Sequence, residues 1–243
     1  MHFSTFAALS AAAAVVPSVS AHGYVSGVVS GGNWYAGASP SWIYSSAKPK
    51  QAGWFAHNQD NGFVDGTVYQ SGDIICHKNA TTGNTYIPVA AGSTIDLQWN
   101  TWPDSHHGPN LEFFKIGGKG LIDDSTVPGK WASDELMANN NTWSLTIPKN
   151  LKPGGYVLRH EIIALHSAGS TNGAQNYPMC INLKVSGTGT DLPAGVKGTA
   201  LYKNTDAGIL VNIYQTLSSY TVPGPAIPAV FKTAAKRAVG FRA

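Results

Sequence analysis

The stretch Thr94-Ile95-Asp96-Leu97-Gln98-Trp99 decides the fold. Its apolar residues alternate with polar ones, and in an extended chain this period of two places the apolar side chains on one face. Residues 143–147 and 181–185 repeat the alternation, and a longer strand is expected over 156–166, after the turn Gly154-Gly155. Clusters of Gly, Pro, Asn and Ser separate these segments. The pattern predicts an all-β protein, an immunoglobulin-like or fibronectin-like antiparallel β-sandwich.

Between the strands we expect long loops and short helices. A helix is predicted around residues 133–139, with Ser133 as its N-cap, and residues 209–213 fit either a strand or a helix. In a rigid sandwich the loops usually carry the function. The irregular stretches expected to form surface loops are 31–63, 100–110, 117–142 and 167–178.

The composition agrees with a β-rich chain and excludes one class of function. Charged residues make up 12% of the 243 residues, about half of their usual share, and 27 residues are Gly. The formal net charge is +3, and four of the bases lie in residues 229–243, so the rest of the chain sums to −1. We therefore expect no binding of nucleic acid, which requires a basic surface.

The two ends of the chain differ from its body. Residues 1–21 are typical of a secretory signal, because their apolar run is shorter than the roughly 20 residues of a membrane span and Val19-Ser20-Ala21 suits cleavage. We expect residues 22–228 to form the β-sandwich domain and residues 229–243 to form a basic, flexible tail. No later segment is apolar enough to span a bilayer, so we predict a secreted, extracellular monomer. Cleavage after Ala21 makes His22 the first residue of the mature chain.

The cysteines and two short motifs agree with secretion. Cys76 and Cys180 are the two cysteines of the chain, and an even count in an oxidising compartment predicts one disulfide bond. The alternative is a pair of buried free thiols. Asn79-Ala80-Thr81 and Asn140-Asn141-Thr142 are acceptor sequences for N-glycosylation, which places them on surface loops.

His22 offers metal chemistry that a chain terminus can provide. The α-amine of a mature protein has a pKa of about 7.7–8, and with Nδ1 of the same residue it can chelate a metal in a six-membered ring. A second histidine would complete a planar, T-shaped site of three nitrogens. Nitrogen donors in a tetragonal arrangement favour Cu(II). The alternative is a histidine that follows the cleavage site by chance.

The second imidazole has candidates in the stretch Ser105-His106-His107-Gly108-Pro109. Proline fixes the local backbone and glycine allows a close approach, so this loop can hold an imidazole rigidly. Adjacent residues of an extended segment point in opposite directions, so one of His106 and His107 is expected to face the metal. The alternative is a pair of exposed loop histidines.

The strand expected over 156–166 contains two further histidines. His160 and His166 share a face but lie about 20 Å apart in a regular strand, so they cannot both bind one metal. We expect His160 to be a core histidine with satisfied hydrogen bonds, and His166 to reach a surface site at the end of the strand. Gln175 and Tyr177 have the same parity, which places an amide and a phenol on one side.

These motifs together resemble a fungal lytic polysaccharide monooxygenase of auxiliary activity family 9, formerly called glycoside hydrolase family 61. The resemblance covers almost the whole chain between residues 22 and 228. It rests on His22 and on the segments 105–109, 159–168, 173–180 and 220–225.

The resemblance implies a role for each residue of a copper site. His22 supplies its amine and Nδ1 to one copper ion, His106 is the second histidine ligand, and Tyr177 fills the axial position. His166 and Gln175 correspond to the pair that hydrogen-bonds the oxygen species, the kind of outer contact on which metal sites depend.

The resemblance also implies the reaction and the substrate. Copper, O2 or H2O2 and an external electron donor cleave β-1,4-glucan chains such as cellulose oxidatively at C1 and/or C4. Tyr220 is expected on a flat binding face, and Tyr44 and Trp42 in the early loop are expected to act similarly, because aromatic rings can lie against sugar rings.

Three alternatives remain open on the sequence alone. The first is a secreted copper-binding protein that does not oxidise polysaccharide. The second is a glycoside hydrolase, which needs two carboxylates about 5–10 Å apart, and the third is a carbohydrate-binding sandwich without activity. The choice between C1 and C4, activity on soluble glucans or hemicelluloses, the reductant, methylation of His22 and the role of the basic tail are likewise left open.

Overall fold

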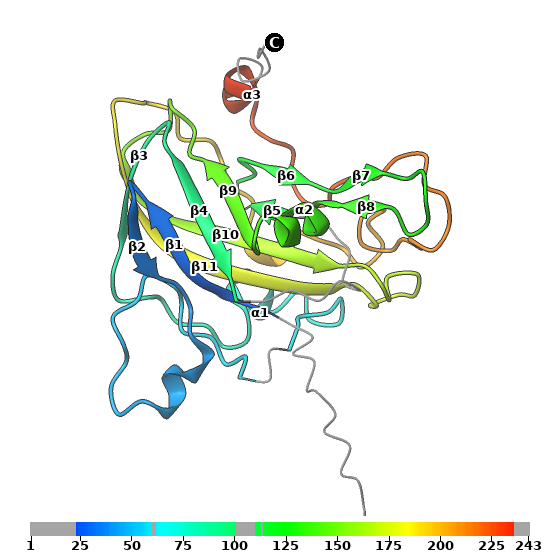
Figure 1. Ribbon diagram of the computed structural model, residues 1–243, viewed down its shortest axis with the longest axis horizontal. Coiled ribbons are helices and arrows are strands. Elements are labelled where there is room, and N and C mark those ends of the chain that lie inside the picture. The colour runs from blue at the N-terminus through cyan, green and yellow to red at the C-terminus, as the bar shows by residue number, and fades with distance from the viewer. Residues whose placement is uncertain (1–22, 60–61, 101–109, 113, 236–243) are drawn as a thin grey trace, which may run out of the picture.

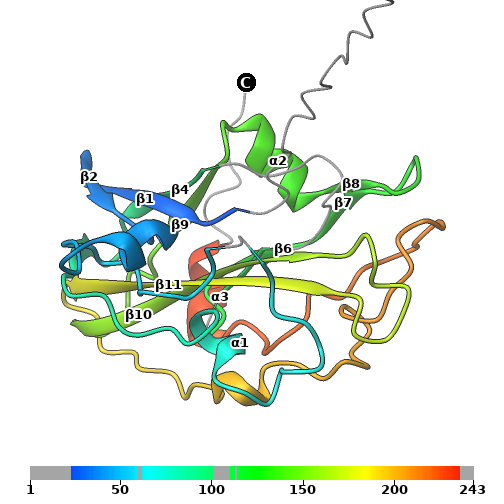
Figure 2. The ribbon, with the colours of Figure 1, turned by 90° about the horizontal axis from the view of Figure 1, so that it is seen from below.

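The protein is a two-layer β-sandwich in the computed structural model, which describes residues 23–59, 62–100, 110–112 and 114–235 (Figure 1). One sheet has the strand order β2-β1-β4-β9 and the other β3-β11-β10-β5-β6. Seen from below, the sheets form separate layers, with α2 on the side of the first and α1 on the side of the second (Figure 2). Neighbouring strands are antiparallel except β3 and β11, which are parallel. The predicted fold class is confirmed.

The bounds of the elements are as follows. The strands of the first sheet are β1 (Val25–Ser30), β2 (Asn33–Ala36), β4 (Thr94–Trp99) and β9 (Thr142–Thr146). Those of the second sheet are β3 (Ile87–Ala90), β5 (Asn110–Glu112), β6 (Gly118–Lys119), β10 (Gly154–Ala164) and β11 (Gln175–Ser186). A small third sheet pairs β7 (Leu121–Asp123) with β8 (Lys130–Trp131). The helices are η1 (Pro40–Tyr44), α1 (Asp73–Cys76), α2 (Ala132–Ala138), η2 (Gly198–Ala200) and α3 (Ala229–Ala235).

Both faces of the second sheet are covered. The apolar residues that alternate with polar ones in β4, β9 and the end of β11 pack between the two sheets. Leu97 and Leu183 belong to one buried cluster there. On the opposite face of β10, Ile163 belongs to a second cluster beneath the segment after η2, together with Ile209 and Ile213. Burial on both faces explains why β10 and β11 are the longest strands, at 11 and 12 residues.

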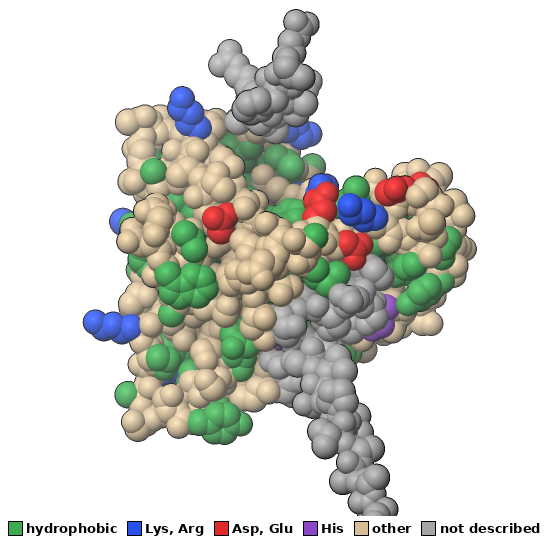
Figure 3. Space-filling model, in the orientation of Figure 1, with side chains coloured by type: hydrophobic (Ala, Val, Ile, Leu, Met, Phe, Trp, Pro, Cys, Tyr) green, Lys and Arg blue, Asp and Glu red, His purple; other side chains and the backbone are tan. Residues whose placement is uncertain are grey.

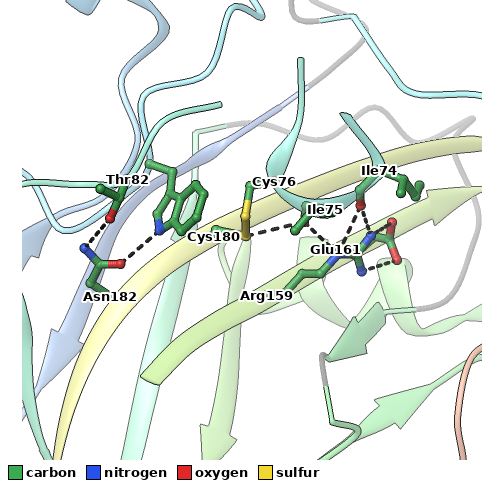
Figure 4. The surroundings of a disulfide bond; sticks show 9 residues. Ile74, Ile75, Cys76, Thr82, Arg159, Glu161, Cys180 and Asn182 are labelled. Atoms are coloured by element: carbon green, nitrogen blue, oxygen red, sulfur yellow. Dashed lines mark hydrogen bonds and ion pairs between the residues drawn. A yellow bond between two sulfur atoms is a disulfide. The ribbon is translucent and has the colours of Figure 1, made fainter. Parts of the chain in front are cut away.

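The disulfide between Cys76 and Cys180 ties α1 to the middle of β11 (Figure 4). This confirms the pairing expected from the even number of cysteines. The bond closes a loop with a sequence separation of 104. A loop of about 100 residues corresponds to roughly 4–5 kcal/mol of stabilisation in the chain-entropy account.

Several loop expectations are wrong in detail. The stretch 31–63 contains β2 and η1, and 117–142 contains β6, β7, β8 and α2. Helix α2 begins at Ala132, and its N-cap is Trp131 and not the predicted Ser133, because the backbone N–H of Trp131 is held by Oδ2 of Asp134 at 2.6 Å. Residues 209–213 form neither a helix nor a strand.

The C-terminal segment is packed beyond Pro228, where the sequence predicts a flexible tail. Residues 229–235 form α3, and Phe231 is only 5% exposed in the core between the sheets. Its ring lies 6.1 Å from that of Phe114, and Nδ2 of Asn150 donates a 3.1 Å hydrogen bond to the carbonyl of Val230. Residues 236–243 lie outside the described part of the chain. None of the helices in the described ranges is long and apolar enough to cross a membrane.

Candidate functional site

The structure brings the first described residues of the chain next to the end of β4. The backbone N–H of Tyr24 donates a 2.7 Å hydrogen bond to Oδ1 of Asn100, and the N–H of Asn100 donates at 3.1 Å to the carbonyl of Tyr24. One residue further along, Val25 of β1 is opposite Trp99 of β4. His22 and His106 themselves, with His107, lie outside the described residues. The segments that lead into them nevertheless begin side by side.

Tyr177 and Gln175 form a contact at the start of β11. The phenol of Tyr177 donates a hydrogen bond to Oε1 of Gln175 at 2.9 Å, so the two side chains lie on one side, as their equal parity predicts. Tyr177 is buried in the core between the sheets, and its ring lies 6.2 Å from that of Phe63. Burial raises the pKa of Tyr177 far above its ordinary value, so the phenol keeps its proton at neutral pH.

His166 lies at the same end of the β10–β11 pair. Gln175 is the cross-strand partner of Ala164, the last residue of β10, and His166 follows two residues later. His166 is half-buried. The structure therefore places His166, Gln175 and Tyr177 at one end of a single strand pair.

A buried ionic network on the opposite face fixes this strand end. Nη2 of Arg159 lies 2.6 Å from Oε1 of Glu161, and both side chains are buried. Arg159 also donates to the backbone carbonyls of Ile74 and Ile75 at the end of α1 (Figure 4). Nδ2 of Asn176 donates to Oε1 of Glu161 at 3.1 Å. Because Asn176 stands between Gln175 and Tyr177, the network holds the alternation that points those two side chains to the other face.

His160 is a core residue, but its hydrogen bonds are not satisfied. It is fully buried, and within the described structure neither ring nitrogen has a hydrogen-bond partner. Its ring lies 5.6 Å from that of Trp99, and Met179 is its cross-strand partner. Burial, with a smaller contribution from the Arg159 charge, lowers the pKa of His160 to about 3. The expectation of a satisfied core histidine is therefore wrong.

The aromatic residues predicted for a binding face differ in exposure. Tyr44 is 81% exposed and borders an open hollow with Tyr24, Pro40, Ser41 and Gln59. Trp42 is half-buried: its indole N–H donates to the carbonyl of Ala56, and its ring packs against Phe55.

Tyr220 does not offer a free ring face in the way the sequence suggests. Its ring packs 4.9 Å from that of Trp131, and its hydroxyl donates to the carbonyl of Gly208 at 2.6 Å. The exposed aromatic residue of this segment is Tyr214, at 58% exposure, which sequence reasoning missed. Residues 213–215 form bends, so no strand or helix periodicity in the sequence indicates which of their side chains is exposed.

The donor set fits a copper ion. Within the described residues no group of three His, Cys, Asp or Glu side chains could hold a metal, and the predicted nitrogen ligands His22 and His106 lie outside those residues. The described residues that flank these two histidines meet through the Tyr24–Asn100 hydrogen bonds. A set of ligands made of nitrogen donors and one neutral phenol suits copper, whereas a set of carboxylate ligands would suit Mg²⁺ or Ca²⁺.

An antiparallel β-sandwich with these features is the architecture of a copper-dependent lytic polysaccharide monooxygenase. The family "Auxiliary Activity family 9 (formerly GH61)" matches residues 22–221, and the chain belongs to this family. It is 54% identical over 240 residues to AA9 family lytic polysaccharide monooxygenase A of Talaromyces verruculosus, covering 91% of this chain and 73% of that protein. It is 53% identical over 223 residues to AA9 family lytic polysaccharide monooxygenase A of Thermoascus aurantiacus, covering 84% and 98%.

A solved structure gives the same result for the fold. The extended catalytic domain of H. jecorina LPMO9A superposes with a TM-score of 0.82 at 48% sequence identity, covering 86% of this chain and 91% of that one. The chain is therefore a copper-dependent oxidoreductase of polysaccharide degradation, and the glycoside hydrolase and inactive-sandwich alternatives are excluded.

Proposed function

We propose that this protein is a secreted enzyme that cleaves cellulose and related β-1,4-glucans oxidatively at C1 and/or C4. The observation that carries the proposal is the pairing of Tyr24 with Asn100, which brings together the described segments on either side of the two predicted histidine ligands. The Gln175–Tyr177 pair follows on the neighbouring sheet, because the ring of Trp99 lies 5.6 Å from that of His160, whose cross-strand partner Met179 is two residues from Tyr177. Secretion is proposed because His22 gains its α-amine only when residues 1–21 are removed.

The roles of the chain's own residues follow from this arrangement. His22 would hold copper through its amine and Nδ1, His106 through one ring nitrogen, and Tyr177 would face it from the core. When bound, copper supplies one-electron chemistry with an external reductant and activates O2 or H2O2. Gln175 already accepts the Tyr177 hydroxyl through Oε1, which leaves its amide nitrogen to donate outward. His166 is half-buried at the same end of the β10–β11 pair, and its imidazole would hold or move a proton beside Gln175.

The substrate face would be formed by exposed rings near this end. Tyr44, Tyr24 and the hollow between them adjoin the segment that leads to His22. Tyr214, at 58% exposure, is the exposed ring of the C-terminal part. It follows Val211, whose N–H donates to the carbonyl of Ala168, two residues after His166, and we propose it in place of Tyr220. A flat, open face explains how a protein can act on a solid polymer without drawing one chain into a cleft.

Two further proposals concern the mature protein. Asn79 and Asn140 are both exposed, which agrees with glycosylation at these positions. We also propose that the protein acts as a monomer with residues from 22 onward as one domain, extended by α3 to Ala235.

The decisive experiment is product analysis. The copper-loaded protein is incubated with cellulose and ascorbate, and mass spectrometry is used to look for aldonic acids and C4-ketones. Oxidised ends support the proposal and show which carbon is attacked. Copper uptake without oxidised products would favour the alternative of a copper-binding protein. N-terminal sequencing of the secreted protein must begin at His22, since any preceding residue converts the amine into an amide and removes a ligand.

A further inference from the structure

We infer that the protein carries a second polysaccharide-binding site on the outer face of the four-stranded sheet, built around Trp34. This inference rests on membership of a polysaccharide-degrading family, and it is independent of the copper ligands and of the end-face rings proposed above. Trp34 belongs to the edge strand β2 and is 56% exposed. A large exposed indole needs an explanation when the surrounding structure is shaped to hold it.

The absence of a side chain at Gly27 leaves the space in which the indole of Trp34 lies. A β-carbon added at Gly27 of β1 would lie 1.8 Å from Cζ2, 2.2 Å from Cη2 and 2.4 Å from Cε2 of Trp34. The six-membered ring therefore occupies the space of the missing side chain. Because the cross-strand partner of Trp34 is Val29 and that of Gly27 is Ala36, the indole must lie diagonally across the sheet. Two small residues, Gly27 and Ala36, leave room for it to lie down.

Fixed polar groups continue the face beyond the indole. Gln98 is the partner of Gly27 on β4, and its side-chain amide is held by the carbonyls of Trp99 and Asn140 and by the hydroxyl of Thr142. In the neighbouring row, Oγ of Ser144 donates to Oδ1 of Asp96 at 2.6 Å. At the spacing of about 4.8 Å between strands, the four strands present a strip roughly 14 Å wide.

The chemistry of this face selects a neutral polyhydroxylated partner. The strands β1, β2, β4 and β9 contain no Lys or Arg, so polyanions such as nucleic acid have nothing to bind. In the view of Figure 1 the same sheet faces the reader, and Figure 3 shows isolated hydrophobic patches there within a mostly uncharged polar surface. A stable protein interface buries about 800 Å² per partner around an apolar centre, which one indole does not provide. One ring flanked by ordered hydroxyl, amide and carboxylate groups suits the apolar face and the hydroxyls of a glucan.

The site lies beside the candidate centre and not on it. Gly27 follows Tyr24 by three residues of extended chain, about 10 Å at the rise of a strand. The indole thus covers the side of the sandwich, whereas Tyr24 and Tyr44 border its end. A polymer surface offers many chains, so one glucan chain can contact the sheet face around Trp34 while another lies at the end of the sandwich. The two contacts together strengthen binding to the polymer without new contacts to the reacting chain.

Binding to microcrystalline cellulose by the copper-loaded protein, without reductant, tests the inference. We expect Trp34→Ala to weaken binding by about fivefold or more, while the affinity for copper stays unchanged. Gly27→Ala keeps the indole but displaces it, because the new methyl group would overlap the ring, and we expect a similar loss. Tyr86→Ala is the matched control, since Tyr86 is equally exposed at 58% but precedes β3 of the other sheet.

A spectroscopic readout separates binding from folding. In a ¹H–¹⁵N spectrum the indole N–H of Trp34, identified by its absence in Trp34→Phe, should shift on addition of cellohexaose. Unaltered cellulose binding by Trp34→Ala, an equal loss in Tyr86→Ala, or a wild-type protein that does not bind cellulose would each overturn the inference. Failure of the proposed function has a different signature: no oxidised product from the wild type, with the binding loss in Trp34→Ala intact.

Discussion

Acid should destabilise this protein through His160, and His160→Leu should remove that sensitivity. The imidazole is buried between Trp99 and Met179 with both nitrogens unpaired in the described structure. Its pKa is about 3 in the folded protein and about 6.5 in the unfolded chain. Between these two values the unfolded chain binds a proton that the folded protein rejects. Stability is therefore complete above pH 6.5 and falls as the pH falls toward 3.

The size of the effect follows from the two pKa values. Each unit of difference corresponds to about 1.4 kcal/mol, so the contribution lost by pH 5 is about 2 kcal/mol and by pH 4 about 3 kcal/mol. Leucine is apolar and similar in volume, so it also avoids the burial of two unpaired nitrogens, each of which costs about 1–3 kcal/mol. We expect His160→Leu to be at least as stable as the wild type at pH 7.5 and to exceed it increasingly toward pH 4.

Urea denaturation of the metal-free, oxidised protein, followed by tryptophan fluorescence between pH 7.5 and 4, measures this difference. Ile162→Leu is the matched control, because Ile162 lies on the same strand and belongs to the core cluster that contains Trp99 and Met179, but it does not titrate. Its curve of unfolding free energy against pH should run parallel to that of the wild type. If the curve of His160→Leu also runs parallel, the imidazole is either protonated or solvated in the folded protein, and the reasoning is refuted.

Three further predictions concern buried contacts. Glu161→Ala leaves the Arg159 charge unpaired and should reduce the unfolding free energy by about 3–5 kcal/mol. Glu135→Ala, which breaks an exposed pair, should reduce it by less than about 1 kcal/mol. Equal losses of the two variants in thermal unfolding would contradict this prediction. Phe231→Ala should cost about 3–5 kcal/mol and Val230→Ala, at 44% exposure, very little; a flexible tail would make both silent in the same measurement. Tyr177→Phe should retain copper but alter its EPR spectrum, and an unchanged spectrum would argue against a position facing the metal.

The sequence predicts those features that depend on local periodicity. Alternation in 94–99 and 181–185 identifies strands correctly because in each strand the apolar residues face the core between the sheets, although the polar residue Asn182 is buried as well. The parity of Gln175 and Tyr177 predicts that their side chains share one side of the strand, because β11 is regular at that point, and the structure adds the hydrogen bond between them. The disulfide follows from the cysteine count alone. In each case the decisive information lies within a few residues or in composition.

Features that depend on distant packing could not be predicted in this way. The partners of His160 are set by which side chains from β4 and β11 face it, and the sequence of β10 alone does not show that they are an indole and a methionine. Tyr220 is held by Trp131 and Gly208, and its own segment gives no sign of either. The burial of Phe231 depends on Phe114, over one hundred residues earlier.

The buried ion pair beside the candidate centre is best understood as a register device. Replacing buried ion pairs with apolar residues often stabilises a protein, so stability alone does not account for Arg159 and Glu161. The residue opposite Glu161 on β11 is Pro178, which has no N–H to donate, and the amide of Asn176 reaches Glu161 diagonally instead. A slip of one residue would exchange the two faces of β11 and turn Gln175 and Tyr177 away from the end where residues 24 and 100 meet. Such a slip would also leave the buried carboxylate of Glu161 without its partner Asn176. The network therefore raises the free energy of the slipped register relative to the native one.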